Sequence, residues 1–226
     1  MKFPPVNIAL IGPPGSGKGS YGRKLAQLFS IELLTASTLL KKSKLNITTG
    51  KLLDDEVVSE TIVQHIPDSP YFLDGFPRTI NQVKLMEETW PESLQLNAAI
   101  SLEVPRQVCL EKVLGRRYCK KCNINWNVAD VKYGQFSMPP FLPKKNVDAC
   151  TGEGDHAWIQ RDDDQLEIIE GRLDEFYDTI APVLEHYESK GKLFRFKPYN
   201  GFDDIPRFES SLLAWANGLC KRRSYL

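Results

Sequence analysis

The sequence predicts an α/β fold built on a parallel sheet with helices on both sides. Short apolar runs of strand length alternate along the chain with segments whose apolar residues recur at helical spacing. This alternation is typical of parallel sheets with right-handed crossovers. The first run, Val6–Ile11, leads directly into a glycine-rich stretch, Gly12–Ser20, and then into a helical pattern over Tyr21–Phe29. A glycine turn between a strand and a helix is typical of phosphate-binding loops.

Five strands are expected in order along the chain. The strand-like runs are Val6–Ile11, a weaker run at Leu33–Leu34, Tyr71–Leu73, Ala98–Leu102 and Leu193–Phe196. Apolar residues recur every three or four positions between Leu166 and Tyr187, which predicts one long helix with a single buried face. A last helix is expected over Phe208–Leu219. We therefore expect a single five-stranded parallel sheet covered by helices.

Length and charge argue against several classes of protein. The chain has 226 residues, with 29 basic and 29 acidic side chains. This balance provides no bulk field that would attract nucleic acid or a membrane surface, and no apolar run has the length of a membrane span. The first strand begins too early to leave room for a secretory signal. We expect a monomer inside the cell, most simply in the cytoplasm.

The glycine-rich stretch contains the groups that phosphate binding requires. Its glycines let backbone N–H groups turn inward, and the following helix N-terminus adds partial positive charge. Lys18 can reach a β- or γ-phosphate, and the Ser20 hydroxyl can face Mg²⁺. The alternative is a glycine turn that only joins a strand to a helix, but Lys18 and Ser20 both occur where the chemistry needs them. The residues expected to hold the triphosphate are Gly15, Ser16, Gly17, Lys18, Gly19 and Ser20.

A second stretch, Tyr71–Thr79, ends a predicted strand in an acid. Asp74 at such a position beside a phosphate loop can hold a magnesium-bound water. Gly75 lets a ligand approach the backbone closely, and Arg78 can form two parallel hydrogen bonds with a phosphate. Pro77 favours a turn here in any case, and a turn is compatible with a site.

These stretches resemble those of the adenylate kinases and their close relatives in the nucleoside monophosphate kinase family. The motifs that follow in the family's order are Asp74–Thr79 with Gln82, Gly115-Arg116-Arg117, Gln160–Asp164 and Arg172. The resemblance covers nearly the whole chain. It implies a P-loop fold whose core comprises residues 1–35, 65–115 and 162–226, with an acceptor-binding segment over 36–64 and a lid of the long type over 116–161.

The resemblance implies reversible transfer of a phosphoryl group from Mg-ATP to AMP, giving two ADP. Such a site gathers many negative charges and must exclude water, so the lid is expected to close over bound nucleotides. The cations that the resemblance places around the phosphates are Lys18, Arg78, Arg116, Arg161 and Arg172. For the donor, ATP, it adds Lys112 and Pro198. For the acceptor, AMP, it implies Thr35, Lys41, Lys51, Leu53, Gly75, Arg78 and Gln82.

The acceptor segment departs from the family pattern. The family's Ser-Thr-Gly-Asp stretch reads Thr35-Ala36-Ser37-Thr38 here, and the arginine that follows it becomes Lys41. Lysine keeps the charge but loses the planar fork of arginine, and the segment is shorter than usual. Two alternatives therefore stay open. One is a relative with another nucleotide pair, such as GTP with AMP, and the other is a nucleotide-binding regulator with weak catalysis.

Three of the five cysteines, Cys119, Cys122 and Cys150, fall in the predicted lid, which is longer than most because of Val131–Lys145. In zinc-carrying lids of the family a second pair follows the first, but Val147 stands at the third ligand position and cannot bind a metal. The residues that could supply the missing ligand are Asp148, Asp155 and His156. A tetrahedral zinc site and a metal-free lid held by hydrogen bonds are both open. A nucleic-acid-binding module built on this knuckle is a third alternative, against which the neutral charge argues.

Overall fold

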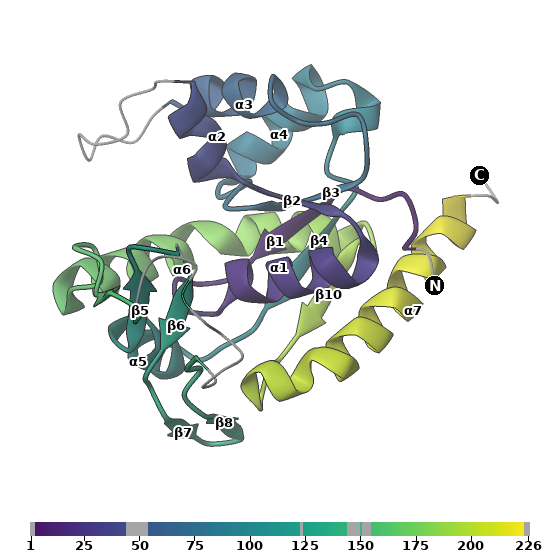
Figure 1. Ribbon diagram of the computed structural model, residues 1–226. Helices are drawn as coiled ribbons and strands as arrows, with labels where there is room; N and C mark the ends of the chain where they lie inside the picture. The colour runs from purple at the N-terminus through teal and green to yellow at the C-terminus, as the bar shows by residue number, and fades with distance from the viewer. Residues whose placement is uncertain (1–2, 44–53, 123, 144–149, 151–154, 224–226) are drawn as a thin grey trace.

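The computed structural model describes residues 3–43, 54–122, 124–143, 150 and 155–223. Its centre is a five-stranded parallel sheet with strand order β10-β4-β1-β3-β2 (Figure 1). The strands are β1 (Ile8–Ile11), β2 (Glu32–Thr35), β3 (Tyr71–Asp74), β4 (Ala98–Leu102) and β10 (Leu193–Phe196). The predicted α/β class and its five-stranded parallel sheet are confirmed.

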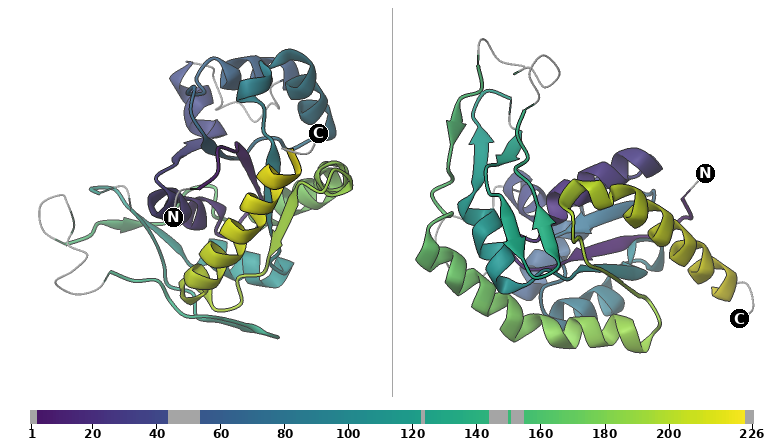
Figure 2. Two further views of the ribbon diagram at one scale, coloured as in Figure 1. Left: turned by 90° about the vertical axis from the view of Figure 1, so that its right-hand side faces the viewer. Right: turned by 90° about the horizontal axis from the view of Figure 1, so that it is seen from below.

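Helices cover both faces of this sheet (Figures 1 and 2). On one face lie α1 (Lys18–Phe29) and α7 (Ile205–Arg223), and on the other lie α4 (Ile80–Thr89) and α6 (Leu166–Ser189). The remaining helical elements are α2 (Ala36–Lys42), α3 (Asp55–Val63), α5 (Arg106–Leu114), and the 3₁₀ turns η2 (Glu92–Leu94) and η3 (Gly201–Asp204).

Strand β1 is buried on both faces, as an apolar run in a parallel sheet should be. Ile8 and Leu10 pack into the cluster under α1 and α7, whereas Ala9 and Ile11 pack into the cluster under α4 and α6. Each large aliphatic side chain buried in this way contributes about 1.5–3 kcal/mol to stability. The strand that precedes the glycine-rich loop is therefore firmly fixed.

The register of the strands brings the predicted site to one edge of the sheet. Leu10 of β1 and Thr35 of β2 both lie opposite Asp74, the last residue of β3. Because all five strands are parallel, their carboxyl ends share this edge, and ligands of open α/β sheets bind there. The loop that follows β1 lies beside the end of β3 for this reason.

The long predicted lid forms two separate small sheets. The lid sheet consists of β6 (Asn125–Asn127), β5 (Arg116–Cys119) and β9 (Trp158–Ile159), and the lid hairpin consists of β7 (Val131–Tyr133) and β8 (Phe136–Met138). The hairpin lies beside α5 in Figure 2. Its residues Val131, Phe136 and Met138 are buried in a cluster with residues of α5 and α6.

The lid hairpin is also attached to the loop after β10. The backbone N–H of Ser137 donates to the carbonyl oxygen of Tyr199 at 2.7 Å. Phe141, just beyond the hairpin, stacks on Trp126 of the lid sheet and meets Phe202 of η3 edge-on at 4.7 Å between ring centroids. Part of the extra material of the predicted lid is thus packed into the core. Closure of residues 116–161 over nucleotides stays a prediction.

The two long helices differ in detail from their predicted form. Helix α6 has the expected length, but Leu166 and Tyr177 of its apolar stripe are 48% and 43% exposed. Leu166 opens the helix, and Tyr177 faces a cavity of about 520 Å³ between α6, β10 and the lid hairpin. Helix α7 begins at Ile205 and ends at Arg223, so it is longer than the predicted 208–219. Within the described part of the chain, no helix has the length and apolar character of a membrane span.

Candidate active site

The glycine-rich loop wraps tightly between β1 and α1, and two of its glycines are needed for its shape. Gly15 and Gly17 both have φ of +87°, a conformation that residues with a side chain rarely adopt. A Cβ on Gly15 would also lie 2.2 Å from the carbonyl oxygen of Cys109. Gly17 caps α1 without a side-chain hydrogen bond, and the first turn of α1 contains no acid. The helix N-terminus is therefore suited to an anion.

Lys18 lies over this loop. Its Nζ donates to the carbonyl oxygens of Gly12 and, at 3.1 Å, of Pro13. Burial lowers the pKa of Lys18 below its usual value, an effect that the nearby Asp74 carboxylate opposes. The hydroxyl of Ser16 is buried and has no hydrogen-bond partner among the described residues. A phosphate group in the loop would give the Ser16 hydroxyl a partner and place an anion beside the Lys18 ammonium.

Asp74 faces the first turn of α1 across the edge of the sheet. Its Oδ2 lies 3.2 Å from the point that a Cβ on Gly19 would occupy. Burial raises the pKa of this carboxyl group, whereas Lys18, Arg78 and Arg23 lower it. The carboxylate oxygens of Asp74 and the hydroxyl of Ser20 are hard ligands of the kind that Mg²⁺ prefers, so these residues fit the ion that the sequence implies.

Arg78 lies on the turn that follows β3, and Gln82 lies in the first turn of α4. Arg78 is exposed, and its Nε donates to the carbonyl oxygen of Gly75 at 3.0 Å. Gln82 is buried, with its Oε1 accepting from the Arg78 N–H and its Nε2 donating to Asp55, both at 2.7 Å. The amide of Gln82, which the sequence assigned to the acceptor, holds the turn to α3 in this structure.

Asp55 is a residue that the sequence analysis missed. Besides Gln82, its carboxylate accepts hydrogen bonds from Thr79 at 3.0 Å and from Asn81 at 2.9 Å. Asp55 stands in the first turn of α3, where its charge also favours the helix. It therefore joins the predicted acceptor segment to the turn that carries Arg78. The sequence did offer one signal for Asp55, because an acid directly before an apolar helical pattern is typical of the first turn of a helix.

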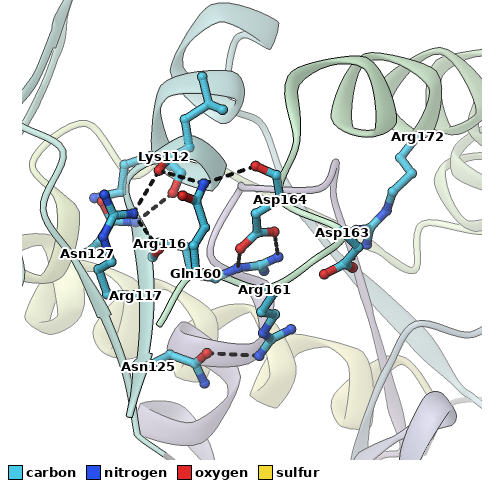
Figure 3. A network of polar contacts seen from close by, with 11 residues as sticks. Lys112, Arg116, Arg117, Asn125, Asn127, Gln160, Arg161, Asp163, Asp164 and Arg172 are labelled. Carbon is cyan, nitrogen blue, oxygen red and sulfur yellow. Dashed lines mark hydrogen bonds and ion pairs between the residues drawn. The ribbon is translucent and has the colours of Figure 1, made fainter. Parts of the chain in front are cut away.

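The cations of the predicted lid entrance and exit form one polar network (Figure 3). The Arg116 guanidinium binds the buried Asp164 carboxylate through two hydrogen bonds, the one from Nε at 2.8 Å. Arg172 pairs with Asp163 at 2.7 Å between Nη1 and Oδ2. Arg161 donates to Asn125 at 2.8 Å. Carboxylate and amide oxygens thus pair with these three arginines in the structure.

Alanine at Asp164 should destabilise the protein far more than alanine at Asp163. Asp164 is 1% exposed, and removing it leaves a largely buried guanidinium unpaired, at a cost of about 3 kcal/mol. The Asp163–Arg172 pair is half exposed, and such pairs contribute about 0–1 kcal/mol. Urea unfolding of the two variants measures the difference. Equal midpoints would show that the Arg116–Asp164 pair does not stabilise the fold.

The structure gathers many, though not all, of the predicted residues. Lys18 lies within electrostatic range of Asp74, Arg78 and Arg172, and Arg161 lies within range of Arg116. Lys112 lies near the lid sheet, where burial lowers its pKa and its carbonyl oxygen accepts from Asn127. Lys41 is exposed on α2, and Pro198 is buried in the loop after β10. The predicted acceptor residues Lys51 and Leu53 lie outside the described residues.

The lid also brings four metal-ligand side chains together. The ligand atoms of Cys119, Cys122, Cys150 and His156 all lie within 4.8 Å of one another. Desolvation opposes ionisation of Cys119, but hydrogen bonds from the Cys122 backbone and the His156 side chain lower the pKa of its thiol to about 5. Three thiolates and an imidazole form a common zinc-binding set. His156 is one of the three residues that the sequence offered in place of Val147, which lies outside the described residues with Asp148.

A glycine loop between β1 and α1, with a lysine over it and an acid at the end of the neighbouring strand, defines a P-loop nucleotide-binding protein. The chain matches the adenylate kinase family over residues 10–192, and it belongs to that family. The resemblance drawn from the motifs is confirmed, and the protein is a phosphotransferase enzyme of this family.

Relatives match along almost their full length. The chain is 31% identical to the adenylate kinase of Acetivibrio thermocellus, covering 89% of this chain and 95% of that protein. It is 32% identical to the adenylate kinase of Syntrophotalea carbinolica, covering 92% and 97%. It is also 32% identical to the adenylate kinase of Moorella thermoacetica, covering 89% and 93%.

Proposed function

We propose that the protein catalyses reversible phosphoryl transfer from Mg-ATP to AMP, giving two ADP. The observation that carries this proposal is the arrangement at the carboxyl edge of the sheet. There the phosphate loop with Lys18 faces Asp74, and Arg78 follows on the same turn. Two phosphate-bearing substrates can meet between these groups. The names of the relatives support the same pair of nucleotides.

Catalysis in this site consists of positioning and charge stabilisation. Lys18 would exchange its bonds to the Gly12 and Pro13 carbonyls for bonds to the donor phosphates, and the loop N–H groups would bind the same oxygens. The attacking acceptor phosphate is already an anion, so no strong general base is required. Arg78, Arg116, Arg161 and Arg172 would neutralise charge on the transferred group, since a guanidinium does not lose its proton.

Magnesium would be held between Ser20 and Asp74. When bound, this ion neutralises charge on the donor phosphate oxygens. Ser20 would offer its hydroxyl, and Asp74 would hold a coordinated water. On the donor side, Lys112 and Pro198 are proposed to contact the nucleoside of ATP. On the acceptor side, the proposed contacts are Thr35, Lys41, Lys51, Leu53, Gly75, Arg78 and Gln82.

Alanine at Arg78 should impair AMP use more than alanine at Lys41. Arg78 can hold a phosphate through two parallel bonds, whereas the Lys41 ammonium acts as a point charge. We expect roughly a hundredfold loss of kcat/KM for AMP in Arg78→Ala and roughly a tenfold loss in Lys41→Ala. Steady-state kinetics with AMP varied at saturating ATP tests this order. A larger loss in Lys41→Ala would show that the two roles are wrongly assigned.

The identity of the two nucleotides is tested by a coupled assay of the purified protein. Each of several nucleoside triphosphates is combined with each of several monophosphates, and diphosphate formation is followed. We expect the highest kcat/KM for ATP with AMP. A maximum for GTP with AMP would replace the proposed donor, and binding of both nucleotides without turnover would favour the regulatory alternative.

We also propose a structural zinc ion in the lid, bound by Cys119, Cys122, Cys150 and His156. Zinc at this position would link the turn after β5 to the chain segment before β9. It would stabilise the lid sheet and take no part in the transfer, because the four-ligand set leaves no open coordination position.

A further inference from the structure

Arg23 lies on α1, one helical turn after Ser20, and was not among the residues that the sequence assigned to the site. Its Nη2 donates to the Ser20 hydroxyl at 3.4 Å. Its Nη1 lies 3.8 Å from the point that a Cβ on Gly19 would occupy, and Asp74 Oδ2 lies 3.2 Å from that same point. The guanidinium and the carboxylate therefore share one face of the first turn of α1.

The charges at this face are unbalanced. Lys18, Arg78 and Arg23 all act on the half-buried Asp74 carboxylate, so three cations lie within electrostatic range of one anion. Arg23 forms no salt bridge with any described residue, and its side chain is exposed. A phosphate beside Asp74 would compensate the excess positive charge, and Arg23 has the freedom to reach it.

The position of Arg23 points to the acceptor rather than the donor. Asp74 lies opposite Thr35 at the end of β2, where α2 and the acceptor segment begin. A Cβ on Gly75 would meet Ala36 at 3.7 Å and Arg78 Nη2 at 3.6 Å. Arg23 therefore approaches Asp74, whose strand neighbour is the start of the acceptor segment. In the proposed function, the loop N–H groups and Lys18 would bind the donor triphosphate instead.

We propose that Arg23 binds the phosphate of the acceptor monophosphate and provides the planar, two-pronged contact that Lys41 cannot provide. This assignment rests on the proposed transfer to AMP. Guanidinium and phosphate match in a bidentate geometry that an ammonium group lacks. The weak bond from Arg23 to Ser20 would be given up when Ser20 turns to the magnesium ion.

The test compares Arg23→Ala and Arg23→Lys with Lys24→Ala, a matched removal of an exposed cation on the next position of α1. Dissociation constants for AMP and for ATP are measured separately by calorimetry, and KM and kcat are measured for each substrate. Arg23→Ala should weaken the binding of AMP about tenfold or more, while its affinity for ATP should stay within twofold of the wild type. The AMP affinity of Arg23→Lys should fall between those of Arg23→Ala and the wild type. Lys24→Ala should change neither the affinity for AMP nor the affinity for ATP.

Two results would overturn the assignment. Either Arg23→Ala behaves like Lys24→Ala, or its loss falls on ATP instead of AMP. Thermal melting of each variant checks that the exposed substitutions leave the fold intact. If the wild type transfers the phosphoryl group to AMP and Arg23→Ala binds AMP equally well, only the role of Arg23 is ruled out. A wild-type protein that neither binds AMP nor phosphorylates it would remove the proposed function together with it.

Discussion

Replacing Lys18 with alanine should slow phosphoryl transfer by about a hundredfold or more while the protein remains folded. Lys18 is the one cation within the loop Gly12–Ser20, and its Nζ bonds to the carbonyl oxygens of the same loop. In the reaction Lys18 would stabilise the negative charge that shifts toward the leaving ADP. Because this contact strengthens in the transition state, binding energy elsewhere in the site does not replace it.

The measurement is kcat at saturating ATP and AMP, with circular dichroism as a check of folding. Lys84→Ala is a suitable control, because Lys84 is an exposed cation on α4. The control should retain wild-type turnover. Near-normal turnover in Lys18→Ala would contradict the assignment of this loop to catalysis.

Replacing Cys119 with serine should remove about one zinc ion per chain and lower the thermal midpoint by about 10 °C. Cys119 is fully buried beside Cys150, with 3.7 Å between the sulfur atoms. Cys122 lies 3.4 Å from Nδ1 of His156. Without a thiolate at position 119, the remaining three ligands cannot complete a tetrahedron. The lid sheet would then lose the stabilisation that the zinc ion provides.

Elemental analysis of protein purified without chelator measures the metal, and calorimetry measures the midpoint. The control is Cys220→Ser, since Cys220 lies on α7 and outside the four-ligand cluster. This variant should keep both zinc and stability. A metal-free wild type whose midpoint does not respond to added zinc would show that the lid is held without a metal.

The fold and the donor loop could be predicted from sequence because their signals are local. Each strand of the central sheet contains at least two adjacent apolar residues, and the Gly12–Ser20 loop is a contiguous motif. Asp74 and Arg78 were predicted for the same reason, since both follow one strand directly. Partners from distant segments were not predicted. Arg23 lies within electrostatic range of Asp74 only because the register of β1 and β3 places α1 beside the end of β3.

The lid hairpin illustrates the same limit. Val131, Phe136 and Met138 belong to strands of three residues, too short for an alternating pattern to show which face is buried. Only the folded chain reveals that they pack against α5 and α6. His156 was one of three candidate metal ligands in the sequence. The pairing of β9 with β5 favours it, because this pairing brings position 156 to the cysteines.

Following the phosphoryl group itself shows whether the protein transfers it from one nucleotide to the other. The protein is incubated with Mg²⁺, AMP and ATP labelled in its γ-phosphoryl group, and the products are separated. The proposed function predicts that the label appears in the β-position of ADP, depends on AMP, and is nearly lost in Lys18→Ala. Label that remains in ATP, or that is released as inorganic phosphate, would contradict it.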